Sequence, residues 1–481
     1  MQSSPIGSTA NASVWTKIFY GSGATPFGIK DTGFNFFLLL YYNQVLGLDP
    51  FLTGLALALA VAIDAVSDLA VGYLSDNWRS KLGRRHPFMY LAIIPAAATF
   101  YLLWNPPSSV LEEQNTLFVY LIFMAVLVRS CLTFYEVPNA AQGPELTKDY
   151  DDRTRLMAFR YFFGWMGGLI MAVLTYVVLF QLDPAGQMGP IGYQSLGVIG
   201  GIAMMIFMLI SSLGTHHHIE TFYRPIKRES HSIRVIYQRF RGLFQNRSFV
   251  SVFISSLFFG AAAGLSQSLN IYINTFFWSL TLTELALIPL LGLAAVPTSF
   301  VLAPRLSEKL GKKKATMYSF LFAISFLPIA YLVQIAGYFP DRGNSIYVPL
   351  LMLNYFIETT AIITMQIIFA SMNADIVEDR SAASAGERDE GLIFAARNFS
   401  KKAVSGLGVM LSGTILWIVS FPDGAIPGQV DTEVVTFLIL VYLPFVMVLY
   451  LCSWYVLRYY QIDKKTHEAN LAVESKNQST T

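Results

Sequence analysis

Two stretches of this sequence match each other about half a chain apart: Gly72-Tyr-Leu-Ser-Asp76 followed by Leu82-Gly83-Arg84-Arg85, and Leu306-Ser307-Glu308 followed by Leu310-Gly311-Lys312-Lys313. Each holds an acid, then a Leu-Gly pair, then basic residues. A single copy would carry little information, because any helix that leaves a membrane inward can end in a glycine and basic residues. Two copies at equivalent positions indicate two halves of the same design, repeated in parallel.

The chain around both copies is too apolar for a water-soluble protein. Hydrophobic residues make up 54% of its 481 residues and charged residues 13%, whereas soluble domains carry about 25% charged residues. Runs of about 18 or more apolar residues predict membrane-spanning helices. Twelve such spans are predicted: 24–47, 51–75, 87–105, 116–140, 157–181, 194–214, 248–278, 284–304, 315–338, 347–374, 391–420 and 433–457. The predicted fold class is therefore an all-α membrane protein.

Positive charges divide the loops between these spans into two kinds. Lys and Arg crowd alternate loops, such as 79–85 and 305–314, and the other loops are nearly bare of them. Since cytoplasmic loops carry the excess of Lys and Arg, both termini are predicted to lie in the cytoplasm. The predicted parts are an N-terminal six-helix bundle (1–215), a cytoplasmic linker (216–247), a C-terminal six-helix bundle (248–460) and a cytoplasmic tail (461–481).

The second predicted span carries two aspartates, in Val61-Ala-Ile-Asp64-Ala-Val-Ser-Asp68. Residues four apart share one face of a helix. Carboxylates are costly inside a bilayer and are functional candidates by default. The two charges repel each other unless a proton or a cation sits between them, or unless an arginine pairs with them. Oxygen ligands favour a hard ion such as Na⁺, so we expect a cation-coupling site here, with a structural ion pair as the alternative.

Further charged residues lie in other predicted spans. In the fourth span, Arg129, Thr133 and Glu136 have spacings that keep them on one side of a helix, from which the hydroxyl and the carboxylate could face the second span. Arg129 complicates the cation hypothesis, because it could itself neutralise an aspartate. The tenth span carries Glu358, for which a coupling role and a structural role are equally consistent with the sequence.

These residues resemble the glycoside-pentoside-hexuronide:cation symporters, over nearly the whole chain. The matching stretches are Tyr20-Gly-Ser-Gly with Lys30-Asp31, Asp64-Ala-Val-Ser-Asp68 with Gly72, Thr133-Phe-Tyr-Glu136-Val-Pro138, Arg160-Tyr-Phe-Phe, Ala374-Asp375-Ile-Val and Lys402. Singly each stretch is weak, and together they are specific. The resemblance implies a major facilitator fold with two six-helix bundles.

The resemblance also implies roles for individual residues. Asp64, Asp68 and Thr133 look like the family's Na⁺/H⁺ site, with Na⁺ held by the two aspartates. Four residues look like the family's polar groups that hold sugar hydroxyls: Lys30, Asp31, Glu136 and Arg160. Lys402 looks like the family's cavity lysine, which links the two bundles electrostatically. We further expect a cytoplasmic latch, in which acids of the repeated motif bind arginines or helix ends of the opposing segment in one state and release them in the other. The expected gating residues are Gly72, Asp76, Gly83, Arg84, Arg85 and Glu308.

The predicted function is cation-coupled symport of a sugar, glycoside or hexuronide by alternating access, in a bacterial inner membrane. The alternative is cation-coupled transport of a lysophospholipid or another amphiphile, because vertebrate lysophosphatidylcholine symporters are also similar. An enzyme is not expected, since no nucleophile, histidine cluster or metal motif accompanies the acids. The only cysteines, Cys131 and Cys452, indicate neither a disulfide framework nor a metal site. We expect a monomer with a small-molecule substrate in a lipid bilayer, no nucleic-acid partner and no cofactor besides the coupling Na⁺ or H⁺.

Overall fold

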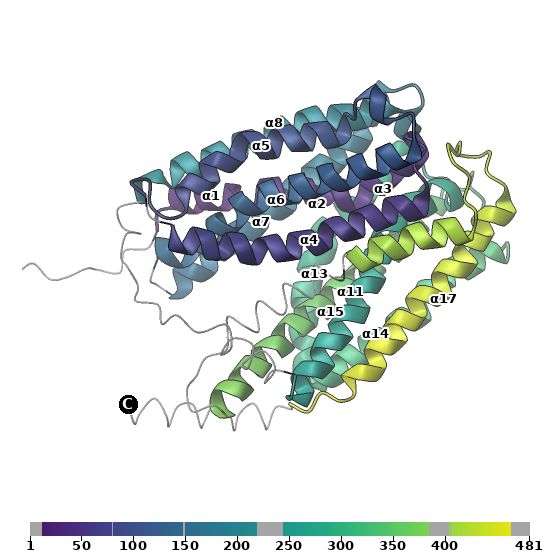
Figure 1. Ribbon diagram of the computed structural model, residues 1–481. Helices are drawn as coiled ribbons and strands as arrows, with labels where there is room; N and C mark the ends of the chain where they lie inside the picture. The colour runs from purple at the N-terminus through teal and green to yellow at the C-terminus, as the bar shows by residue number, and fades with distance from the viewer. Residues whose placement is uncertain are drawn as a thin grey trace, which may run out of the picture. The chain divides into compact units, whose positions relative to one another are not determined.

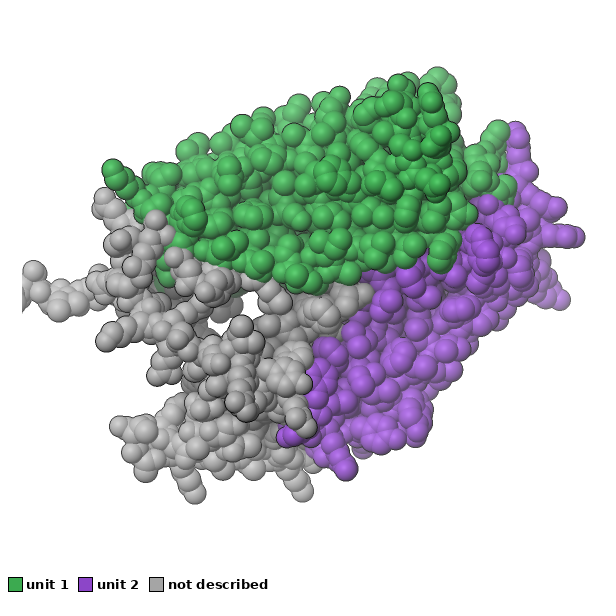
Figure 2. All heavy atoms as spheres, viewed as in Figure 1, with its two compact units in different colours: residues 1–227, 281–286, 422–427 green, residues 228–280, 287–421, 428–481 purple. Residues whose placement is uncertain are grey.

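The structure is a computed structural model that describes residues 12–78, 80–147, 150–218, 244–383, 404 and 406–462. These residues form helices joined by turns and short loops, without a β-strand among them (Figure 1). They belong to two compact units, shown in green and purple in Figure 2. Unit 1 comprises residues 1–227, 281–286 and 422–427, and unit 2 comprises 228–280, 287–421 and 428–481. The predicted limits of the bundles and linker stay a prediction, because 219–243 lies outside the described residues.

Five long helices build most of unit 1. They are α4 (Pro50–Asn77), α5 (His86–Trp104), α6 (Gln114–Leu146), α7 (Tyr150–Val177) and α8 (Pro190–Gly214). α4 packs along α6, and α5 packs along both α6 and α8. A proline stands in the first turn of α4, α5 and α8, where its missing N–H leaves no hydrogen bond unmade.

The first predicted span, 24–47, is broken into short pieces, and a further short helix precedes it. The preceding helix is α1 (Val14–Ser22), and the pieces are α2 (Thr25–Thr32), the π-helical η1 (Gly33–Phe37), α3 (Leu38–Leu40) and the π-helical η2 (Tyr41–Val45). The predicted start falls within one residue of the start of α2, and the additional helix α1 begins where the Ser13 side chain caps the backbone N–H of Thr16 at 3.1 Å. Pro26 then starts α2 as a separate helix.

Glycines allow α2 to approach α7 very closely. A Cβ atom on Gly28 would run into the carbonyl oxygen of Gly164 and lie 2.8 Å from the amide nitrogen of Gly168. The Thr32 hydroxyl donates a hydrogen bond of 3.0 Å to the Gly168 carbonyl across the same contact. Small residues of this kind let helix backbones touch within a membrane. The contact between α2 and α7 therefore depends on Gly28 having no side chain.

Unit 2 is built from long helices of the second half of the chain. They are α11 (Arg247–Tyr272), which continues into the π-helical η7 (Ile273–Phe277), and α13 (Leu287–Leu310), α14 (Lys312–Ile335), α15 (Tyr347–Ala383) and α17 (Thr432–Leu457). α13 packs along α15, α11 along α17, and α14 against both α15 and α17. The short helix Gly406–Ile418 falls within the predicted eleventh span, most of which lies outside the described residues. α12 (Leu282–Leu285) belongs to unit 1.

Within the described ranges, 10 helices are long and apolar enough to cross a membrane. They coincide with the second to tenth and the twelfth predicted spans, which are thereby confirmed as helices. Their outer faces are apolar: the side chains of Leu91 and Ile94 on α5 are 69% and 72% exposed. Contiguous exposed apolar faces of this kind are rare in soluble monomers, so these faces require an apolar surrounding such as lipid.

The repeated Leu-Gly motif has the same backbone conformation in both units. Gly83 and Gly311 each have φ of 76°, a left-handed conformation that glycine adopts without a Cβ clash. Each glycine lies just before the next long helix, α5 in unit 1 and α14 in unit 2. The repeat seen in the sequence is therefore also a repeat of local structure.

The structure contains a second repeated turn, which the comparison of the two halves of the sequence did not reveal. After η2, Gly47 has φ of 77°, and the Leu48 N–H donates to the Tyr42 carbonyl at 2.8 Å. After η7, Ser279 has φ of 49°, and the Leu280 N–H donates to the Asn274 carbonyl at 2.9 Å. In both turns a side chain then caps the next helix, from Asp49 before α4 and from Thr281 before α12.

The loop 422–427 joins unit 1 through polar contacts with η2. Gln44 donates to the Pro422 carbonyl at 3.2 Å and accepts from the Ala425 N–H at 2.8 Å. Asn43 donates to the Asp423 carboxylate at 3.4 Å. Burial raises the pKa of Asp423 above its ordinary value, and the hydrogen bond from Asn43 offsets only part of that rise.

Candidate functional site

α4 presents Asp64 and Asp68 to α6 within unit 1. The two aspartates lie one turn apart on α4, which packs along α6. Asp64 is 3% exposed, and Asp68 is half-buried. The predicted shared face is thus present, and it meets the helix that carries Arg129 and Thr133.

The Thr133 hydroxyl bridges the two aspartates. Its oxygen lies 3.0 Å from Asp64 Oδ1 and 2.9 Å from Asp68 Oδ1. A hydroxyl has one hydrogen to donate, so it cannot donate to two carboxylates at once. The second contact is favourable when the other carboxyl carries a proton and donates to the hydroxyl, or when a cation reduces the repulsion of the three oxygens. The geometry therefore fits a site that binds a proton or a hard cation.

Arg129 forms an ion pair with Asp64. Its Nη1 atom donates to Asp64 Oδ2 at 3.2 Å, and its guanidinium carbon lies 4.7 Å from the centroid of the Phe34 ring. Phe34 belongs to η1, so three elements surround this guanidinium. One charge of the aspartate pair is therefore balanced by an arginine, and Asp64 and Asp68 do not share an identical environment.

A second polar cluster joins α6 to α7. Arg160 Nη2 lies 3.5 Å from Glu136 Oε1, and Arg160 Nη1 donates to Asn139 Oδ1 at 2.5 Å. The Asn139 amide donates to the Ser211 hydroxyl of α8 at 3.2 Å. The guanidinium also lies 5.9 Å from the Tyr20 ring centroid. The structure thus brings together two residues predicted to bind substrate, Glu136 and Arg160.

The other predicted substrate residues are placed differently. Lys30 and Asp31 form an ion pair of 2.6 Å with each other, with the lysine buried and the aspartate 39% exposed. In the described part of the chain, neither forms an ion pair with Glu136 or Arg160. Lys402 lies outside the described residues.

The predicted gating residues lie at the ends of helices. Gly72 is in α4, where an added Cβ would only touch Val137 at 3.7 Å. Arg85 is buried at the N-terminus of α5, and Arg84 is half-buried beside it. Glu308 is exposed in the last turn of α13. Asp76 lies in α4, and its side chain is outside the described residues.

Sequence reasoning missed two members of the site, Asn139 and Phe34. Asn139 stands three residues after Glu136, a spacing that places both on one side of α6, so this signal was available. Phe34 carried no signal, since aromatic residues make up 14% of the chain.

Apolar helices in two units, with paired charges held inside one of them, define a membrane transporter with the major facilitator fold. The whole-chain likeness to a solved structure agrees: the nucleoside transporter NupG has a TM-score of 0.63 at 14% identity, over 93% of this chain and 99% of that chain. The chain belongs to the MFS/sugar transport protein family, whose model matches residues 19–464. The predicted fold class and family are thereby confirmed.

Several curated proteins are also similar to this chain. An uncharacterized symporter of Synechocystis sp. is 33% identical over 201 residues, which is 41% of this chain and 36% of that protein. The isoprimeverose transporter of Lactiplantibacillus pentosus is 21% identical over 79% of this chain and 75% of that protein. The sodium-dependent lysophosphatidylcholine symporter 1-A of Danio rerio is 30% identical over 31% of this chain and 27% of that protein.

Replacing Thr133 with valine is expected to weaken cation binding by about 10- to 100-fold. Valine keeps the shape but removes the hydroxyl, and a hydrogen bond to a charged group contributes about 1.5–3 kcal/mol. The measurement is the cation concentration, Na⁺ or H⁺, that gives half-maximal stabilisation of the purified protein.

Two matched variants accompany this test. Thr133→Ser keeps the hydroxyl and should keep the affinity. Thr175→Val removes a buried hydroxyl whose one hydrogen bond within the described residues goes to the Met171 carbonyl of its own helix at 2.7 Å, and it should leave cation binding unchanged. A Thr133→Val protein with the cation affinity of the unmodified protein would contradict the assignment.

Proposed function

We propose that this protein is a secondary active transporter that moves a sugar, a glycoside or a hexuronide across a membrane together with Na⁺ or H⁺. The observation that carries the proposal is the Thr133 hydroxyl, 3.0 Å from Asp64 and 2.9 Å from Asp68. Such a triad of oxygens repels itself when empty and binds a small positive ion when filled. Membership of the MFS/sugar transport protein family supports the same proposal.

Cation binding and substrate binding are coupled because the cation either occupies or leaves the site formed by Asp64, Asp68 and Thr133. An external cation binds at Asp64, Asp68 and Thr133, reduces their repulsion and favours the state that binds substrate. The protein with both ligands bound then changes from the outward-open to the inward-open conformation, because each ligand stabilises the conformation that it binds best. Na⁺ and H⁺ are both consistent with an oxygen-only site.

The substrate groups proposed are polar and charged. Glu136 and Arg160 are joined at 3.5 Å, and Lys30 and Asp31 at 2.6 Å. Carboxylates accept hydrogen bonds from sugar hydroxyls, and charge-assisted bonds are about twice as strong as neutral ones. Arg160 can bind the carboxylate of a hexuronide in a bidentate manner. Lys402 stays a proposed member of the same site.

The proposal also covers the cytoplasmic gate of the transporter and the membrane in which the protein lies. The left-handed turns at Gly83 and Gly311 support a role for the repeated motifs in a cytoplasmic latch, with Gly72, Asp76, Arg84, Arg85 and Glu308 as the other proposed members. The protein is proposed to be a monomer in a bacterial inner membrane with both termini in the cytoplasm, as the positive loops and the bacterial relatives support.

A lysophospholipid is the second candidate substrate. The likeness to the lysophosphatidylcholine symporter of Danio rerio favours it, although this likeness spans only 31% of the chain. A lysophospholipid would pair its phosphate with Arg160 or Lys402 and lay its acyl tail along apolar side chains. The broader coverage of the isoprimeverose transporter, 79% of the chain, favours a sugar.

A competition experiment separates the two candidates. Purified protein is heated with sugars, glycosides, uronates or lysophosphatidylcholine, each with and without Na⁺ at two pH values. A stabilising sugar or uronate whose effect grows with Na⁺ or with acid supports the proposal, because ligands that bind the folded state raise its melting temperature. Cation-dependent stabilisation by the lysolipid alone would instead establish the second candidate.

A further inference from the structure

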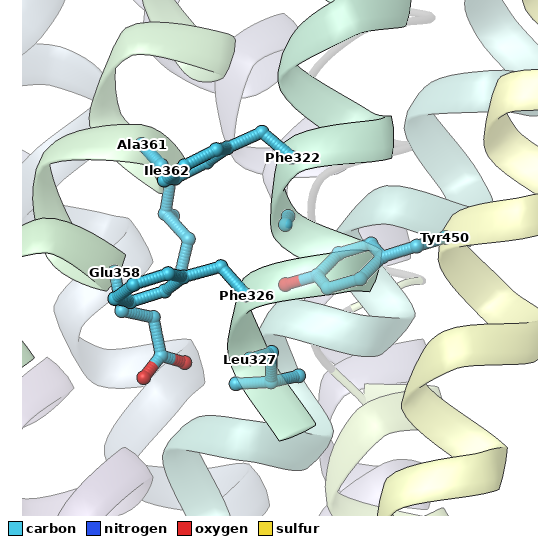
Figure 3. Close-up of a pocket in the computed structure, with 8 residues that line it drawn as sticks. Phe322, Phe326, Leu327, Glu358, Ala361, Ile362 and Tyr450 are labelled. Atoms are coloured by element: carbon cyan, nitrogen blue, oxygen red, sulfur yellow. The ribbon is translucent and has the colours of Figure 1, made fainter. Parts of the chain in front are cut away.

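α15 places one carboxyl group, Glu358, in an apolar pocket of unit 2. The pocket is small and partly open, and it is lined by residues of α14, α15 and α17. Its other lining residues include Phe322, Phe326 and Leu327 from α14, Ile362 from α15 and Tyr450 from α17. Figure 3 shows Glu358 and Tyr450 entering this region from α15 and α17. Atom Oε2 of Glu358 is buried and has no hydrogen-bond partner within the described residues.

Among the described residues, the ionisable groups found near Glu358 are tyrosines. They are Tyr331 of α14, Tyr355 of α15, and Tyr442 and Tyr450 of α17. Among the described residues, α11 and α13 contribute no charged group to this set. Two of the tyrosines are bonded elsewhere: Tyr355 donates to Asn274 at 2.5 Å and Tyr442 to Ser266 at 2.9 Å.

This environment suits a neutral carboxylic acid and opposes a carboxylate. A carboxylate inside a membrane is tolerated when a cation, hydrogen-bond donors or water compensate it. The lining of this pocket supplies mainly aromatic and aliphatic carbon, and Oε2 receives no hydrogen bond from the part of the chain that the structure describes. A carboxyl group in such a place holds a proton until its surroundings change.

We propose that Glu358 is a proton-binding site of unit 2, separate from the cluster at Asp64 and Asp68. Glu358 holds one proton in the present packing of α14, α15 and α17. When that packing opens, the O–H bond of the acid breaks, the proton passes to water, and the carboxylate remains in the hydrated pocket. Proton occupancy and helix packing are therefore linked, and each shifts the other by the same factor. Only the use of this proton in transport rests on the proposed function.

Infrared spectroscopy of the purified protein tests proton binding directly. The unmodified protein should show a carboxylic acid carbonyl band at neutral pH, where exposed acids are ionised. Glu358→Gln should remove that band, and Glu358→Asp, which keeps a carboxyl group, should shift it. Asp64→Asn and Asp68→Asn should leave it in place. Glu433→Gln, which changes an exposed glutamate of α17, should also leave it.

Thermal unfolding gives a second and independent readout. A group that keeps its proton in the folded state and loses it on unfolding makes stability fall as the pH rises. As the pH rises from mildly acidic, where an exposed glutamate already ionises, to neutral, the melting temperature of the unmodified protein should therefore fall more steeply than that of Glu358→Gln, while Glu433→Gln should follow the unmodified protein.

Two infrared results would contradict proton binding by Glu358. No acid band at neutral pH, or an acid band whose intensity Glu358→Gln does not lower, shows that Glu358 is ionised there. If Glu358→Gln does not fold, a Glu358→Asp protein without a shifted band has the same meaning. A protein that transports nothing yet shows the band and its loss would leave the proton site intact and refute only the proposed function.

Discussion

Replacing Asp64 with asparagine is expected to lower cation-stimulated uptake by about 30-fold or more, because truncating one partner of a buried, hydrogen-bonded charge pair costs about 2–5 kcal/mol. Asp64 receives hydrogen bonds from both Arg129 and Thr133. Without its charge, the triad loses one of its two anionic oxygens, and Arg129 stays buried without its counter-ion. The measurement is uptake into membrane vesicles as a function of Na⁺ and of pH.

A double variant separates ion coupling from a purely structural ion pair. Asp64→Asn combined with Arg129→Gln removes both charges, and neutral replacements of a buried ion pair are often well tolerated. We expect this variant to recover the folded yield but to remain insensitive to the cation. A double variant with normal cation dependence would show that Asp64 serves only to neutralise Arg129, and the cation site would then have to be sought elsewhere.

Replacing Gly28 with alanine is expected to destabilise unit 1 by about 3 kcal/mol or more, since overpacking a tight contact typically costs about 1–3 kcal/mol and the obstacle here is backbone. The new methyl group would meet the Gly164 carbonyl and the Gly168 amide of α7, neither of which can rotate away. α2 and α7 would have to separate, and the hydrogen bond from Thr32 to the Gly168 carbonyl would lengthen. The measurement is thermal unfolding of the purified protein in detergent.

Gly72→Ala is the matched control for this prediction. Its Cβ would lie 3.7 Å from Val137, an ordinary contact, and alanine favours a helix over glycine by about 1 kcal/mol. The control protein should melt at or above the temperature of the unmodified protein. Equal stability of the Gly28 and Gly72 variants would mean that α2 and α7 do not pack as closely as described.

The sequence predicts the membrane helices well, because length and apolarity alone decide whether a helix can span a bilayer. It does less well where local chemistry breaks a helix. Two π-helical segments divide the span at 24–47, and a separate helix, α1, which begins at the capping side chain of Ser13 and ends at Gly23, precedes it. Hydropathy does not register any of these features.

In the candidate site, too, sequence spacing predicts which residues share a helix face, but it does not predict which residues of the neighbouring helix they contact. Asp64 with Asp68, and Arg129 with Thr133, were predicted to share faces because a helix fixes their relative directions. Which partner each one meets depends on how α4 and α6 are rotated about their axes. The sequence therefore left open whether Arg129 would pair with Asp64, and it missed the bond from Arg160 to Asn139.

The matching turns after η2 and η7 show one backbone conformation held by two different residues. Gly47 and Ser279 occupy the same place in the same sequence of backbone hydrogen bonds, yet only one is a glycine. A left-handed conformation costs a residue with a side chain about 1–2 kcal/mol, so selection on that turn alone would favour glycine twice. The second turn therefore keeps this backbone conformation without the residue best suited to it.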